Sequence, residues 1–179
     1  RFPTIMPHLD VQEGKEIPYI AFVTGAAHAT KRLPTSKIIN ICKKIKQPVV
    51  LLGGPDEAEK GDTIAKEAGL HVINACGQLT LNESASLVRQ AHKVIAHDTG
   101  LMHMAAAFGK EIISVWGNTI PEFGMYPYDP DPASRIFEVK GLSCRPCTKI
   151  GKEKCPRGHF RCMNDIDNDS LVHAASQLY

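Results

Sequence analysis

The sequence predicts a doubly wound α/β domain built around a parallel sheet, because two patterns alternate along it. Short segments that are apolar throughout, of which 19–24 is the first, predict buried strands. Between them lie segments whose apolar residues recur at helical spacing, as Ile38, Cys42 and Ile45 do. Strands that alternate with helices are typical of a parallel sheet with helices on both faces.

The predicted strands are runs of apolar residues that stop at a turn residue. The run 48–52, for example, stops at Gly53 and Gly54. Strands are expected at 19–24, 48–52, 71–74, 94–96 and 111–116, with a sixth at 135–139. A strand that is apolar on both faces must be covered on both, which favours a parallel arrangement.

The predicted helices are bounded by residues that suit helix ends. They are expected at 33–46, 55–68, 84–91 and 99–108, with a closing helix at 167–179. Pro34 suits the first turn of the first helix, and Gly69 suits the position after the second. Asn82 or Thr80 is expected to cap the third helix.

Composition and charge exclude several classes of protein. The chain has 179 residues, 43% of them hydrophobic and 22% charged, which fits one globular domain rather than a disordered chain. A formal net charge of +2 argues against a dedicated nucleic-acid-binding protein. No window is apolar over the 18 or more residues that a membrane span requires, so no transmembrane segment is expected.

Four of the six cysteines gather near the C-terminus, in a Cys-rich loop at 141–162. They are Cys144, Cys147, Cys155 and Cys162. Four thiolates suit a tetrahedral zinc site, with His159 as a substitute ligand, but the second CxxC pair of a zinc ribbon is absent. Disulfides and free thiols in a compact loop are the alternatives. The cysteine usage favours a reducing compartment.

The turn at 97–103 combines features of an anion site. Ligands of doubly wound domains bind beyond the carboxyl ends of the strands, and this turn follows a strand and opens a helix. Backbone N–H groups at Thr99 and Gly100 and the helix dipole favour a phosphate, and His103 lies one turn further on. The alternative is that Asp98 or Thr99 is a simple N-cap and His103 a surface residue.

Two further turns are expected at the same sheet edge. The turn at 24–32 has small residues followed by Lys31 and Arg32, which could neutralise a diphosphate or only begin a solvated helix. The turn at 53–57 offers Glu57 to the hydroxyls of a ribose, or only to the dipole of the next helix. Together the three turns favour a nucleoside diphosphate that carries another group. Because GxGxxG is absent, an ordinary Rossmann dehydrogenase is disfavoured.

These motifs resemble glycosyltransferase family nine, the ADP-heptose–lipopolysaccharide heptosyltransferases. The similar stretches are 98–109, beginning Asp-Thr-Gly-Leu-Met-His, then 31–34, 53–57 and 116–118, and they occur in the family's order. The family has the GT-B architecture of two Rossmann-like domains that face each other across a cleft. The resemblance implies that this chain is the C-terminal, donor-binding half. It implies a linker at 1–18 from an N-terminal domain and a donor domain at 19–179.

The resemblance also implies roles for individual residues. Glu57 would hold the ribose, Asp98 the sugar, and Leu79 with Thr80 the adenine pocket. The diphosphate would be bound by Lys31, Thr99, Gly100, Leu101 and His103. The general base is expected in the missing domain, so no catalytic residue is assigned within this chain.

The function implied is inverting transfer of heptose from ADP-heptose to the lipopolysaccharide inner core. The acceptor, lipid A–core, would bind the missing domain, and this piece alone is expected to bind ADP weakly without catalysing transfer. No cofactor is required, and structural zinc is left open. The expected place is the cytoplasm, with a peripheral position at the inner face of the inner membrane left open. A non-catalytic nucleotide-sugar binding module and a zinc interaction domain built on the four clustered cysteines are the alternative functions.

Overall fold

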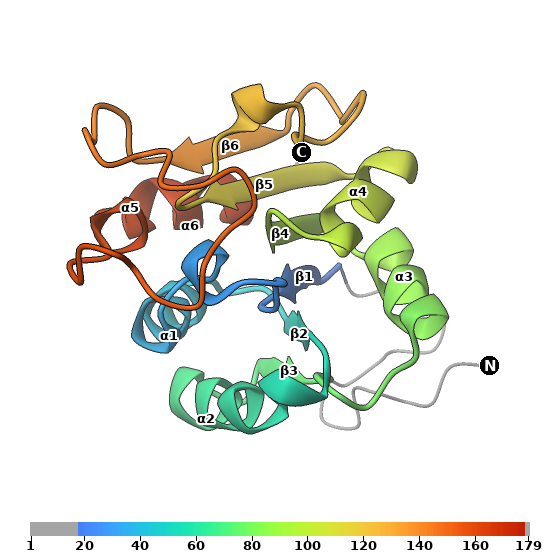
Figure 1. Ribbon diagram of the computed structural model, residues 1–179. Coiled ribbons are helices and arrows are strands. Elements are labelled where there is room, and N and C mark those ends of the chain that lie inside the picture. Colours follow the sequence, from blue (N-terminus) through green and yellow to red (C-terminus); the bar gives the residue numbers. More distant parts are fainter. Residues whose placement is uncertain (1–17, 178–179) are drawn as a thin grey trace, which may run out of the picture.

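The structure, a computed structural model, describes residues 18–177 and contains one six-stranded sheet (Figure 1). All strand pairs are parallel, and the order is β3-β2-β1-β4-β5-β6. The strands are β1 Ile20–Val23, β2 Val49–Leu52, β3 Val72–Asn74, β4 Lys93–His97, β5 Glu111–Trp116 and β6 Arg135–Glu138. The predicted parallel α/β fold and all six predicted strands are therefore confirmed.

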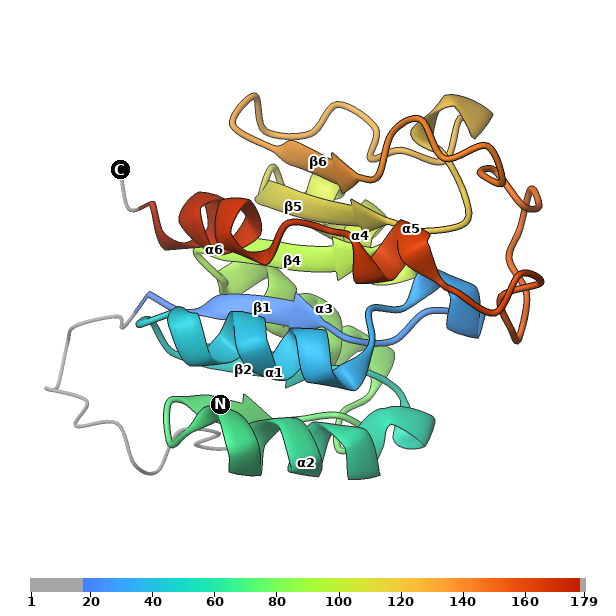
Figure 2. The same ribbon diagram turned by 90° about the vertical axis from the view of Figure 1, so that its left-hand side faces the viewer.

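Helices cover both faces of the sheet (Figures 1 and 2). The α-helices are α1 Thr35–Lys44, α2 Ala58–Ala68, α3 Leu81–Gln90, α4 Gly100–Ala107, α5 Arg161–Asn164 and α6 Asn168–Ser176. Residues 18–177 also contain three 3-10 turns: η1 Ala29–Lys31, η2 Pro55–Glu57 and η3 Pro121–Phe123. Helix α1 lies between α2 and α6 on one face, and α3 packs beside α4 on the other. No helix among residues 18–177 is long and apolar enough to cross a membrane.

Alternate residues of the central strand belong to two different cores. Ile20 and Phe22 of β1 pack under α1, α2 and α6, whereas Ala21 and Val23 pack under α3 and α4. Successive side chains of a strand point to opposite faces, so a fully apolar strand supplies both cores. Burial of both faces explains why the strands are continuous apolar runs rather than alternating apolar and polar residues.

The third helix begins three residues earlier than predicted, at Leu81, with Thr80 as its N-cap. The Thr80 side chain accepts from the backbone N–H of Glu83, and a Glu83 carboxylate oxygen accepts from the N–H of Thr80 at 2.7 Å. This reciprocal capping box satisfies two backbone donors and fixes the helix start. Of the two predicted caps, Thr80 is confirmed.

The predicted closing helix is present as α6, but it ends at Ser176 rather than at residue 179. The closing helix α6 is capped by Asp167, whose side chain accepts from the N–H groups of Asp169 and Ser170. Residues 178–179, and residues 1–17 of the predicted linker, lie outside the described residues. The short helix α5 was not predicted, because it has only four residues and begins inside the polar Cys-rich segment.

The long segment between β6 and α5 lies at the carboxyl edge of the sheet, beyond the arrowheads of the strands (Figure 2). The guanidinium of Arg145 attaches it to the end of β5 by donating to the backbone oxygens of Gly117 at 2.6 Å and Thr119 at 2.9 Å. The same guanidinium pairs with Glu138 at 2.7 Å. The segment is therefore tied to the edge on which all the predicted ligand turns converge.

Candidate functional site

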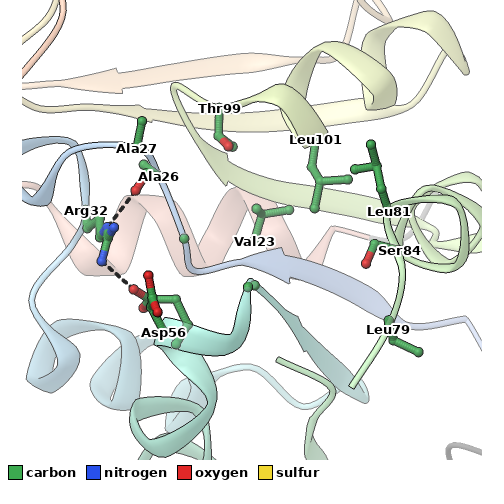
Figure 3. A pocket seen from close by; sticks show the side chains of 14 residues that line it. Val23, Ala26, Ala27, Arg32, Asp56, Leu79, Leu81, Ser84, Thr99 and Leu101 are labelled. Atoms are coloured by element: carbon green, nitrogen blue, oxygen red, sulfur yellow. Dashed lines mark hydrogen bonds and ion pairs between the residues drawn. The ribbon is translucent and has the colours of Figure 1, made fainter. Parts of the chain in front are cut away.

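A pocket of about 460 Å³ lies at the carboxyl ends of β1 and β2, between η2, α3 and the start of α4 (Figure 3). The strand order reverses at this point, because β1 pairs with β2 on one side and with β4 on the other. Open α/β sheets bind ligands at such switch points. All three predicted turns contribute to the wall, through Ala26 and Ala27, Gly54 and Glu57, and Thr99 and Leu101.

An ion pair between Arg32 and Glu57 lies in the pocket wall (Figure 3). The Arg32 Nε donates to the backbone oxygen of Ala26 at 2.8 Å, which fixes the guanidinium beside the pocket. Glu57 is 5% exposed, and Lys60 reaches it at 3.4 Å. Both cations make their hydrogen bonds to the same oxygen, Oε1, so Oε2 of Glu57 accepts no hydrogen bond among the described residues.

A second ion pair, between Lys31 and Asp98, lies beside the pocket rather than in its wall. The Lys31 Nζ is 2.7 Å from Oδ2 of Asp98, and both side chains are almost fully buried. Thr119 Oγ1 lies 3.1 Å from the same oxygen and donates to it. The structure thus brings together two residues that were predicted to bind ligand. However, the ammonium group of Lys31 is paired with Asp98 rather than facing the pocket. Their roles at the diphosphate and the sugar stay predictions.

The anion-binding features of the α4 start are present only in part within the pocket. Thr99 is the N-cap of α4, yet its side chain makes no capping hydrogen bond. Thr99 and Leu101 line the pocket, and a Cβ added at Gly100 would meet open space. The N–H groups of this first turn lack intrahelical acceptors and carry the positive end of the helix dipole. His103 is exposed and outside the wall, so its predicted contact stays untested.

The apolar end of the pocket is formed by Leu79 and Leu81 (Figure 3). Leu79 was predicted there, whereas Leu81 and the buried Ser84 were missed. The capping-box pattern could have located both residues, because it places the start of α3 at Leu81 and so puts Leu81 and Ser84 at the beginning of that helix. The hydroxyl of Thr80 belongs to the capping box, and Thr80 is not part of the wall. A role for Thr80 at the base stays a prediction.

His97, which sequence reasoning passed over, holds one side of the site in place. It is the last residue of β4, is fully buried, and its Nε2 accepts from the backbone N–H of Leu33 at 2.9 Å. Burial and the nearby Arg32 charge lower its pKa to about 4, so the ring is neutral near pH 7. The sequence feature that could have identified His97 is its place as a polar residue at the end of an apolar strand, directly before Asp98.

The four cysteines of the loop are free thiols. The Cys147 thiol donates to the backbone oxygen of Cys144 at 2.9 Å, and Cys144 Sγ lies 3.8 Å from Nε2 of His159. Burial, with the neighbouring thiols, raises the pKa of Cys162 to about 11. Across residues 18–177, no three His, Cys, Asp or Glu side chains are grouped so that they could hold a metal. Zinc at this loop stays a prediction that metal analysis of the purified protein tests.

Relatives of known family share both the sequence and the fold. Residues 5–156 match the family model of glycosyltransferase family 9 (heptosyltransferase). Lipooligosaccharide heptosyltransferase 2 of Haemophilus ducreyi is 28% identical over 90% of this chain and 47% of its own length. Lipopolysaccharide heptosyltransferase 2 of Escherichia coli is 28% identical over 98% and 54%. The chain thus spans about half the length of the curated relatives it matches.

Solved structures give the same result. The structure of E. coli ADP-heptose lps heptosyltransferase II superposes with a TM-score of 0.69 and 21% identity, covering 89% of this chain and 46% of that one. E. coli heptosyltransferase WaaC with ADP superposes with a TM-score of 0.54 and 25% identity, covering 57% and 35%. The fold is therefore that of half of a GT-B heptosyltransferase, and the chain belongs to glycosyltransferase family 9.

Proposed function

We propose that this chain binds ADP-heptose and presents it for transfer to the lipopolysaccharide inner core. The observation that carries the proposal is the pocket at the switch point, which has a buried carboxylate at one wall and a helix start at another. The relatives named above are heptosyltransferases, and one of the similar structures holds ADP. A nucleoside diphosphate needs an acceptor for ribose hydroxyls and donors for phosphates, and the pocket has both.

Glu57 is the proposed ribose-binding residue. Its Oε1 accepts hydrogen bonds from Arg32 and Lys60, while its Oε2 accepts none among residues 18–177. A carboxylate oxygen that accepts no hydrogen bond within the protein is a strong acceptor for a sugar hydroxyl, because a charged acceptor makes a stronger hydrogen bond than a neutral one. Leu79 and Leu81 then form the surface on which the adenine base lies.

The diphosphate is proposed to lie between the start of α4 and the turn that carries Arg32. The N–H groups of Gly100 and Leu101 would donate to phosphate oxygens, with the Thr99 hydroxyl beside them. Lys31 is proposed to contact the diphosphate by giving up part of its pairing with Asp98, the residue proposed nearest the sugar. Hydrogen bonds from the helix start, with Lys31 and Arg32 beside them, would stabilise the diphosphate, so we propose that transfer needs no metal cofactor.

The reaction proposed is a single inverting displacement at the anomeric carbon. A hydroxyl of the acceptor loses its proton to a base outside this chain and attacks the carbon, while the bond from that carbon to the phosphate oxygen breaks. The electron pair leaves with ADP. Donors aimed at the diphosphate stabilise this developing charge and so lower the barrier.

The acceptor is proposed to be lipid A–core, bound by a second domain, with the enzyme in the cytoplasm at the inner face of the inner membrane.

Calorimetric titration of the chain with ADP-heptose tests donor binding. One saturable site that ADP competes for is expected, and absence of binding would overturn the proposal. Transfer of heptose to lipid A–core by these 179 residues alone would contradict the assignment of the base to another domain.

A further inference from the structure

The charge of this chain is concentrated in one segment at the edge of the sheet. Residues 140–161 contain seven Lys or Arg and a single acid, Glu153. The rest of the chain contains 14 Lys or Arg and 18 Asp or Glu, so the small net charge of +2 conceals a strong separation of charge. We call residues 149–157, which carry four of these cations, the basic loop.

The cations of the basic loop are free for a partner. Lys149, Lys152, Lys154 and Arg157 are exposed, and none of them forms an ion pair with another described residue. Ile150 stands among them with 58% of its surface exposed. An exposed aliphatic side chain flanked by cations suits a surface that is anionic outside and apolar just beneath, as a lipid bilayer is.

The basic loop is held in a fixed position rather than hanging free. The N–H of Thr30 donates to the backbone oxygen of Lys152 at 3.0 Å, and the N–H of Lys152 donates to Oγ1 of Thr30 at 2.8 Å. Gly151 packs so closely on His28 that an added Cβ would lie 2.6 Å from the His28 Cβ. Because these contacts already order the backbone, docking would cost little backbone entropy, and the cost would come from the side chains.

The same attachment relates the basic loop to the nucleotide pocket. Thr30 belongs to the turn that supplies Ala26, Ala27 and Arg32 to the pocket wall. Figure 2 shows the segment beyond the carboxyl ends of the strands. The residues that line the pocket follow β1, β2 and β4 on the same edge. A flat anionic partner on the basic loop would therefore lie beside the pocket, not behind the sheet.

We propose that the basic loop docks this chain on the anionic surface of a lipid bilayer, so that the donor pocket lies next to a lipid-borne acceptor. The choice of a bilayer over other polyanions rests on the proposed function and on Ile150. Clustered cations gain about 1 kcal/mol each near an anionic leaflet, which is about fivefold in partitioning per charge.

Co-sedimentation with vesicles tests the docking. The chain is expected to sediment with phosphatidylcholine vesicles that contain phosphatidylglycerol, and not with pure phosphatidylcholine vesicles. High salt should release it, because it screens the attraction. The triple variant Lys149→Gln, Lys154→Gln, Arg157→Gln should partition about 100-fold more weakly, at about fivefold per charge.

A matched control removes the same charge from the other edge. Lys43 and Lys66 lie in the last turns of α1 and α2, and Lys46 follows α1; all three are exposed and form no ion pair with a described residue. The variant Lys43→Gln, Lys46→Gln, Lys66→Gln has the same net charge as the loop variant and should bind vesicles within about twofold of the parent. Equal losses in the two variants would overturn the proposal.

Two further outcomes would overturn it: equal sedimentation with neutral and anionic vesicles, or binding to an RNA oligonucleotide with none to vesicles. ADP affinity measured on the same samples separates this proposal from the proposed function. Vesicle docking with no ADP binding would contradict only the pocket assignment, and ADP binding with no docking would contradict only the loop assignment.

Discussion

The ammonium nitrogen of Lys31 lies 2.7 Å from Oδ2 of Asp98, and each of the two side chains is at most 10% exposed. The pair joins the turn after β1 to the turn after β4, which are the two strands at the switch point. A charge buried in this way must keep its partner or lose much of its solvation. The pair therefore fixes two ligand turns relative to each other before any ligand arrives.

Removal of one partner of this pair should destabilise the fold. We expect Lys31→Met to lower the free energy of unfolding by about 3 kcal/mol, because it leaves Asp98 buried with Thr119 as its donor. Urea denaturation measures the change. The control is Lys60→Met, which removes a half-exposed partner of Glu57 and should cost less than about 0.5 kcal/mol. Equal losses in the two variants would contradict the structural role given to Lys31.

Glu57→Gln should abolish the preference for an intact ribose. The parent chain is expected to bind ADP at least about tenfold more tightly than 2′,3′-dideoxy-ADP, since the latter cannot donate hydrogen bonds to the charged acceptor. In Glu57→Gln the two affinities should be nearly equal. Glu59→Gln, in the first turn of α2 and outside the pocket, should keep the preference. A parent that binds both nucleotides alike would exclude Glu57 from the ribose site.

The adjacent glycines at the end of β2 should respond differently to a methyl group. A Cβ at Gly53 would lie 3.0 Å from Cβ of Glu57 and 3.2 Å from Sγ of Cys76, whereas a Cβ at Gly54 meets nothing within 4 Å. We expect Gly53→Ala to cost about 1–3 kcal/mol of stability and to weaken ADP binding by displacing Glu57. Gly54→Ala should preserve stability. Thermal unfolding and ADP titration of both variants check this, and indistinguishable variants would be the contrary result.

Stability should fall as the pH is lowered below about 6.5. The pKa of His97 is lowered to about 4 in the folded chain, so the unfolded chain binds the extra proton between pH 6.5 and 4. The stabilisation is fully present above pH 6.5 and is lost toward pH 4, at about 1.4 kcal/mol per pH unit.

The variant His97→Gln isolates this effect, because an amide oxygen can still accept from the N–H of Leu33 but does not titrate. Its free energy of unfolding, measured in urea from pH 7 to pH 5, should lack the slope that the parent shows. An identical slope in both proteins would assign the pH dependence to other groups.

The sheet and its helices could be predicted from the sequence because a strand that is buried on both faces is a continuous run of apolar residues, which the sequence alone shows. β1, β2 and β4 are apolar at every interior position, and Gly69 follows the helix that it was expected to end. The position of the pocket followed from the rule for parallel sheets. Glu57, Thr99 and Leu101, which were predicted to bind ligand, do line it.

The partners within the site could not be predicted in the same way. Lys31 and Asp98 are both polar residues in turns, and nothing in their spacing shows that each neutralises the other. Arg32, rather than Lys31, is the cation in the pocket wall, a choice set by its hydrogen bond to Ala26. The role of His97 depends on Leu33, which is distant in the sequence and meets it only through the parallel sheet.

The most direct test of the account is the choice of nucleotide. Thermal unfolding of the chain is measured with ADP, UDP, GDP and CDP, each over a range of concentrations. We predict that ADP stabilises the folded chain most, by about 2.7 kcal/mol at a concentration of about 100 times its Kd. Greater stabilisation by UDP, GDP or CDP, or none by any of the four, would contradict it.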